Sequence, residues 1–102
     1  MNNLTEIDHI AIESKNIKIS VDWYKSKFKC KILYQDKTWA LLSFKNISLA
    51  LVNPKEHPSH FAIVDKNICN NPNSKSHRDG IKFIYETDPD KNVIERIDRK
   101  SN

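Results

Sequence analysis

Two histidines stand in predicted strands that are otherwise largely apolar. His9 lies in the alternating segment 7–13, which is rich in β-branched residues, and His60 lies in the similar segment 59–65. Because successive strand side chains point to opposite faces, each imidazole shares its face with an alanine two positions further along. A single strand histidine is usually a packed core residue or a surface residue. Two histidines at equivalent positions favour a shared chemical role.

A glutamate occupies an apolar row in the last predicted strand. Glu95 shares its face with Val93 and Ile97, and burying an ionised carboxylate without a partner costs several kcal/mol. Such a group is protonated, paired or bound to a metal ion. Two imidazoles and one carboxylate are a common ligand set for divalent metals and leave coordination positions open to a substrate. We therefore expect His9, His60 and Glu95 to bind a divalent ion, and this set suits Zn, Mn, Fe, Ni or Co.

The sequence around the two histidines repeats. The segments Asp8–Ile12 and Ser59–Ile63 share the pattern His-apolar-Ala-apolar and lie about 50 residues apart. A period of this length that returns to the same strand type indicates two copies of one supersecondary unit.

The remaining patterns predict the elements that position these side chains. After the first strand, apolar residues at helical spacing predict an amphipathic helix capped by Ser14 or Asn16: Ile17, Val21, Tyr24 and Phe28. Further strands are predicted at 31–36, 38–44, 47–53, 80–87 and 93–98. Residues 66–78 are rich in Asn, Ser and Lys, with Pro72 in the middle, which predicts a short or absent helix there.

Length and composition limit the architecture to one domain. A chain of 102 residues with 38% hydrophobic and 29% charged residues can bury one small core. We expect an α+β fold of two tandem βαβββ-type modules, with module one at about 5–54 and a shortened module two at about 58–99.

The net charge raises the question of nucleic acid, and its distribution argues against it. Lysine and arginine number 17 against 13 acidic residues, which gives a net charge of +4. The densest lysine cluster, at 25–31, surrounds a predicted helix end, where cations favour the macrodipole. No apolar run approaches the roughly 20 residues of a membrane-spanning helix, and the first residues carry no secretory signal. We expect a cytoplasmic protein with reduced cysteines that binds neither nucleic acid nor membranes.

Four stretches together resemble the vicinal oxygen chelate superfamily, which includes glyoxalases, bleomycin resistance proteins and extradiol dioxygenases. They resemble, in order, the family's opening strand, its helix, its second histidine strand and its closing Tyr-x-x-Asp-Pro-Asp-Gly-Asn-x-Ile-Glu motif: Ile7–Ile12, Val21–Phe28, Ser59–Val64 and Tyr85–Glu95. The resemblance spans nearly the whole chain. It implies a glyoxalase-like half-barrel cleft around a divalent metal held by His9, His60 and Glu95.

Three positions depart from the family's pattern. Ala50 stands where many members carry a fourth ligand, within the stretch Leu49–Pro54. This implies a three-ligand site similar to that of extradiol dioxygenases and fosfomycin-modifying transferases. Lys29 and Lys91 replace common glycines at positions that suit a left-handed backbone.

The resemblance implies chemistry in which two neighbouring oxygens of a small substrate coordinate the ion, as in a lyase, isomerase, transferase or dioxygenase. One alternative is a metal-free protein that sequesters a ligand in the manner of bleomycin resistance proteins, and another is a degenerate domain with an interaction role. The catalytic candidates His57 and His77 lie in predicted loops, where a solvated side chain is the simpler interpretation. Tyr85 and Trp39 are candidate substrate contacts or core residues. We expect a homodimer, because small members of this family often pair.

Overall fold

The computed structural model describes residues 4–77 and 80–98, and within them the chain divides into two compact units. One unit consists of His9–His60, and the other consists of the described residues before and after it. The division falls inside two strands, so that His9 and His60 lie at its two boundaries.

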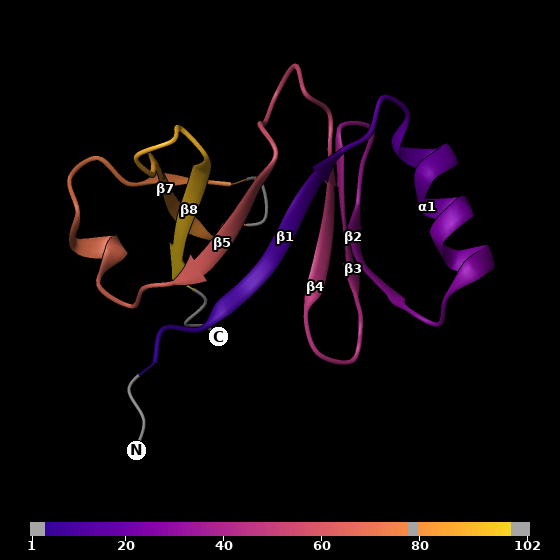
Figure 1. The fold of residues 1–102 in the computed structure, drawn as a ribbon, viewed down its shortest axis with the longest axis horizontal. Coiled ribbons are helices and arrows are strands. Elements are labelled where there is room, and N and C mark those ends of the chain that lie inside the picture. Colours follow the sequence, from indigo (N-terminus) through magenta and orange to yellow (C-terminus); the bar gives the residue numbers. More distant parts are fainter. Residues whose placement is uncertain (1–3, 78–79, 99–102) are drawn as a thin grey trace. The chain divides into compact units, whose positions relative to one another are not determined.

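The His9–His60 unit carries four strands and one helix among its described residues (Figure 1). Its strands follow the order β2-β3-β4-β1, in which β1 pairs in parallel with β4 and the other neighbours are antiparallel. A tight turn joins the third and fourth strands, in which Phe44 N donates to Ile47 O at 3.0 Å. The elements are β1 (Ile7–Glu13), α1 (Ile17–Lys27), β2 (Lys31–Gln35), β3 (Trp39–Ser43) and β4 (Ser48–Val52).

Helix α1 forms where the apolar spacing predicts it. Asn16 is the N-cap, and its Oδ1 accepts a hydrogen bond from Ile19 N at 3.1 Å, which satisfies one of the unpaired donors of the first turn. Ile17 and Val21 are buried against one face of the sheet. Phe28 departs from the expected stripe: it is the C-cap residue with an extended backbone, and its side chain is half-exposed.

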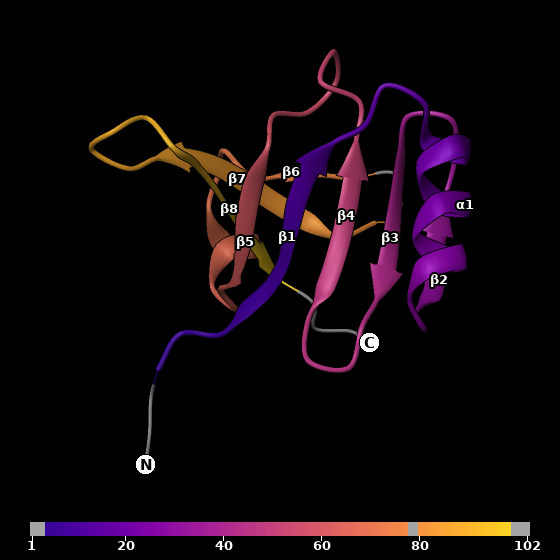
Figure 2. The same cartoon turned by 45° about the vertical axis from the view of Figure 1, so that its right-hand side comes forward.

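The second unit repeats this topology with a reduced helix. Its strand order is β6-β7-β8-β5, with β5 parallel to β8 and the other neighbours antiparallel (Figure 2). The place of α1 is taken by the three-residue 3-10 helix η1, of which only Ile68 is buried. The elements are β5 (His60–Val64), η1 (Ile68–Asn70), β6 (Lys75–Ser76), β7 (Lys82–Thr87) and β8 (Val93–Asp98).

The strand registers make the repeat explicit. In the first unit Ala11 lies opposite Ala50, and in the second Ala62 lies opposite Glu95. The predicted α+β class with two modules, the second shortened, is therefore confirmed.

The two expected left-handed positions behave differently. Among the described non-glycine residues only Lys91 has a positive φ, of 69°, in the turn between β7 and β8. The expectation for Lys29 is wrong, because the extended Phe28 already leads the chain out of the helix. No helix within the described parts of the chain has the length and apolarity to cross a membrane.

Candidate functional site

In the His9–His60 unit the sheet has a helix face and a second face that carries His9. Strand alternation puts His9 and Ala11 on the same side of β1, opposite the side that packs on α1. His9 is buried, with 7% of its surface exposed. Its face continues through Ala50 and Leu41, which pack with Ala11 in a small apolar cluster.

His60 is held in one tautomer at the start of β5. Its Nδ1 donates to the Pro58 carbonyl at 2.7 Å, since a carbonyl oxygen can only accept. In the neutral ring the lone pair is then on Nε2, which is the arrangement that metal-binding histidines show when a backbone carbonyl orients them. The His60 ring meets the His9 ring edge to face, with centroids 5.6 Å apart. The structure therefore brings two of the predicted ligands together within one unit.

Glu95 is almost completely buried in the other unit, with 1% of its surface exposed. It lies opposite Ala62 of β5 and opposite Tyr85 of β7 in the two ladders. Ala62, opposite Glu95, lies two residues after His60 in the same strand. His9, His60 and Glu95 are all buried, as their places in apolar strand rows predict, and their role as metal ligands remains a prediction.

The strand registers also identify the counterpart of Glu95 in the first unit. Ala11 corresponds to Ala62, so Ala50, opposite Ala11, is the counterpart of Glu95, opposite Ala62. A second carboxylate at position 50 would lie on the His9 face of the sheet. The alanine side chain that stands there is buried and has no ligand atom.

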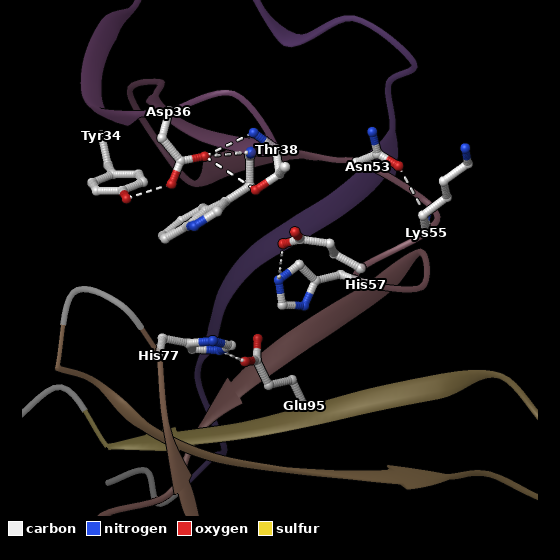
Figure 3. A network of polar contacts seen from close by, with 10 residues as sticks. Tyr34, Asp36, Thr38, Asn53, Lys55, His57, His77 and Glu95 are labelled. Carbon is white, nitrogen blue, oxygen red and sulfur yellow. Dashed lines mark hydrogen bonds and ion pairs between the residues drawn. The ribbon is translucent and has the colours of Figure 1, made fainter.

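His77 contacts Glu95, which the sequence did not predict. Its Nε2 donates to Glu95 Oε2 (Figure 3). Its ring stacks on Phe83 with centroids 3.7 Å apart and an interplanar angle of 4°. His77 lies in a loop as predicted, directly after the short strand β6, but its side chain is not solvated, because it is only 18% exposed and contacts Glu95. The sequence contained only a weak indication of this contact, because the strand that precedes His77 is two residues long and lies between polar loops.

Tyr85 is kept protonated by its surroundings. Burial is the larger cause and the negative charge of Glu95 the smaller one, and together they raise the pKa of the phenol above its usual value. At neutral pH Tyr85 is therefore a hydrogen-bond donor and not a base.

Trp39 is positioned by a network that the sequence analysis missed. Asp36 Oδ1 accepts from Trp39 N at 3.0 Å and from Thr38 N at 2.8 Å, and Tyr34 Oη donates to Asp36 Oδ2 at 2.6 Å (Figure 3). The Trp39 and Tyr34 rings stack with centroids 4.3 Å apart. An Asp-Lys-Thr segment between two strands was the signal for this capped turn.

His57 belongs to the loop between β4 and β5. Its backbone N–H donates to Asn53 O at 3.0 Å, and its Nε2 lies 4.0 Å from Glu56 Oε1, which is a weak ion pair at most. Its role as a catalytic candidate remains a prediction.

No known family profile matches this chain, and no curated protein matches it by sequence. Solved structures do match its fold. A hypothetical protein from Bacillus halodurans C-125 superposes with a TM-score of 0.74 at 16% identity, over 98% of both chains. A glyoxalase/bleomycin resistance protein/dioxygenase superfamily member from Vibrio splendidus 12B01 gives a TM-score of 0.65 at 11% identity, over 93% of this chain and 99% of that one. The chain has the glyoxalase-like fold.

A third solved structure with this glyoxalase-like fold is a variant of methylmalonyl-CoA epimerase from Streptomyces coelicolor, in complex with 2-nitronate-propionyl-CoA. It gives a TM-score of 0.73 at 13% identity and covers 97% of this chain and all of that one. At these identities the likeness concerns the fold. It supports the resemblance to the vicinal oxygen chelate superfamily that the four sequence stretches suggested.

Proposed function

We propose that this chain binds a divalent metal ion through His9, His60 and Glu95 and uses it to hold a small substrate by two neighbouring oxygens. The observation that carries the proposal is the orientation of His60. A buried imidazole whose Nδ1 is tied to a backbone carbonyl presents Nε2 as a ligand atom, and a second buried imidazole lies beside it.

The donor set fits a first-row divalent ion. Imidazole nitrogen is a borderline donor and carboxylate oxygen a hard one, and this mixed set serves Zn, Mn, Fe, Ni and Co, so the donors leave the identity of the metal open. All three residues are buried, and a buried carboxylate is stabilised by an adjacent cation.

The surrounding residues have separate roles in this proposal. A bound ion supplies Lewis-acid stabilisation of a developing oxyanion. His77 fixes the orientation of the Glu95 carboxylate, and of the two catalytic candidates it is the better supported, because of this contact. Tyr85, as a protonated phenol, donates a hydrogen bond to a substrate oxygen, and Trp39 provides an apolar contact. The reaction class remains open among lyase, isomerase, transferase and dioxygenase.

A metal-free ligand-binding protein of the bleomycin-resistance type is the second candidate. The alanine at position 50 favours it, because the second unit has a carboxylate at the equivalent place and the first unit does not. The retention of His9, His60 and Glu95 favours the metal-dependent protein.

Metal analysis separates the two candidates. We expect protein purified without chelator to contain close to one equivalent of a divalent ion, measured by plasma mass spectrometry. The His60→Ala variant should lose this metal. The matched control is His57→Ala, which removes a neighbouring histidine outside the proposed ligand set and should retain the metal.

Three results would contradict the metal-dependent function. They are wild-type protein that neither contains metal nor binds added Co²⁺, a His60→Ala variant with unchanged metal content, and equal metal loss in both variants. The first favours the ligand-sequestering protein. The third would indicate a loop site made by His57 and His60.

Self-association is proposed separately. Trp23 is half-exposed on α1 and packs only partly on its neighbours Tyr24 and Phe28. Sedimentation equilibrium should give the mass of a dimer, and a monomer at all concentrations would contradict this expectation.

A further inference from the structure

A pocket of about 590 Å³ opens at the end of α1, entirely within the His9–His60 unit. It lies between the residues that follow the helix, the start of β2 and the end of β3. Its volume is within the range of about 300–1,000 Å³ that small-molecule sites occupy. None of its lining residues belongs to the proposed metal centre.

The lining is strongly basic. Lys25, Lys29 and Lys31 contribute to it, and no acidic residue does. In the described parts of the chain no ion pair involves any of these three lysines. Lys25 is fixed in place, because its Nζ donates to the Cys30 carbonyl at 2.6 Å. Three lysines and no acidic residue therefore line one opening, so its lining carries a net positive charge.

The helix dipole explains only part of this cluster. Lys25 and Lys27 lie in the last turn of α1, where a cation is favourable, and Lys27 also lies over the Trp23 ring at 5.7 Å. Lys29 and Lys31 lie beyond the helix, where capping does not require them. Their charge is available to a ligand.

The same pocket has a polar and an aromatic side. Lys31 lies opposite Ser43 in the β2–β3 ladder, so an ammonium and a hydroxyl extend from one face of the sheet. The Phe28 and Phe44 rings, also in the lining, approach each other with centroids 6.3 Å apart, and Phe28 is half-exposed. The pocket thus offers cations, a hydroxyl group and an exposed ring side by side.

We propose that this pocket binds a small phosphorylated ligand that carries a planar ring, with its phosphate on Lys29 and Lys31 and its ring on Phe28. Lysines bind phosphate as point charges, and Lys25, Lys29 and Lys31 all line this pocket. Several lysines around one point suit a dianion. The exposed aromatic face accounts for the planar ring, which stacks on it.

The test is an amide NMR titration of the full chain in excess chelator, so that the proposed metal centre plays no part. The probes are adenosine monophosphate for charge and ring, inorganic phosphate for charge alone and adenosine for the ring alone. We expect saturable shifts for adenosine monophosphate at residues 28–31 and 43–44, with binding at least about tenfold tighter than that of either single-feature probe.

Matched variants locate the binding. Lys29→Gln/Lys31→Gln should weaken adenosine monophosphate binding about tenfold or more, because it removes both proposed phosphate contacts. The control Lys37→Gln/Lys55→Gln removes the same charge from exposed positions of the same unit and should leave binding within about twofold.

Four outcomes would overturn the proposal: no saturation by about 10 mM ligand, shifts centred outside the pocket, equal weakening in both double variants, or phosphate that binds as tightly as adenosine monophosphate. Because chelator is present throughout, none of these results depends on whether the metal centre exists.

Discussion

The contact between His77 and Glu95 predicts a measurable coupling energy in the metal-free protein. His77→Phe keeps an aromatic ring to stack on Phe83 and removes the hydrogen bond to a carboxylate that is 1% exposed. Hydrogen bonds to charged groups contribute about 1.5–3 kcal/mol. The His77 side chain is 18% exposed, so water compensates for part of the loss, and we expect a cost of about 2 kcal/mol.

This cost is large enough to measure by two methods. In a domain of this size a loss of about 2 kcal/mol lowers the midpoint of thermal unfolding by roughly 8–16 °C. Urea unfolding in excess chelator gives the same quantity as a free energy. His77→Gln, which retains a donor, should cost less than His77→Phe.

A double-mutant cycle isolates the pair. In a Glu95→Leu background there is no carboxylate to accept the bond, so His77→Phe should cost almost nothing, and the coupling energy should be about 1.5–3 kcal/mol. Replacing the buried carboxylate alone can be neutral or stabilising, because its desolvation cost disappears. A coupling energy below about 0.5 kcal/mol would refute the assignment of this contact as a stabilising interaction.

Three further predictions follow from other positions. Lys91→Gly should raise the unfolding free energy by about 0.5–1 kcal/mol, because it relieves a side chain at φ 69°; an unchanged or lower value in urea unfolding would contradict this. Tyr85 has a pKa raised by burial and by Glu95, so its contribution to stability is fully present below the unfolded-state pKa of about 10 and is lost as pH rises above it. Unfolding measured between about pH 9 and 11 should therefore depend less on pH in Tyr85→Phe than in the wild type, and equal slopes would count against the raised pKa. Ala50→Glu should destabilise the chelated protein and tighten Co²⁺ binding about tenfold or more in a competition assay; weaker binding would show that position 50 cannot supply a ligand.

Much of the fold was predictable because the local patterns agree with the tertiary structure. The first and last strands have the predicted bounds, and Asn16, one of the two predicted caps, is the N-cap of the helix. Alternation also predicted which histidines and which glutamate are buried, because a pleated strand leaves only two faces to choose from.

Contacts between distant segments were not predictable in the same way. The bond between His77 and Glu95 depends on the pairing of β6 with β7, and β6 is too short to leave a pattern. Phe28 has helical spacing with Val21 and Tyr24 but lies past the end of the helix. The spacing of apolar residues alone does not show at which residue the backbone leaves the helical conformation. Lys29 shows the same limit, since the local turn did not need a left-handed residue.

The alanine at position 50 has an electrostatic consequence for the proposed centre. A symmetric duplication would give two carboxylates and, with a divalent ion and neutral imidazoles, a coordination sphere without net charge. In the proposed centre Glu95 would be the single anionic ligand, and the sphere would keep one positive charge. Selectivity should therefore favour chelators that bind as monoanions, such as a singly deprotonated diol or hydroxy-ketone, over neutral ones of the same shape.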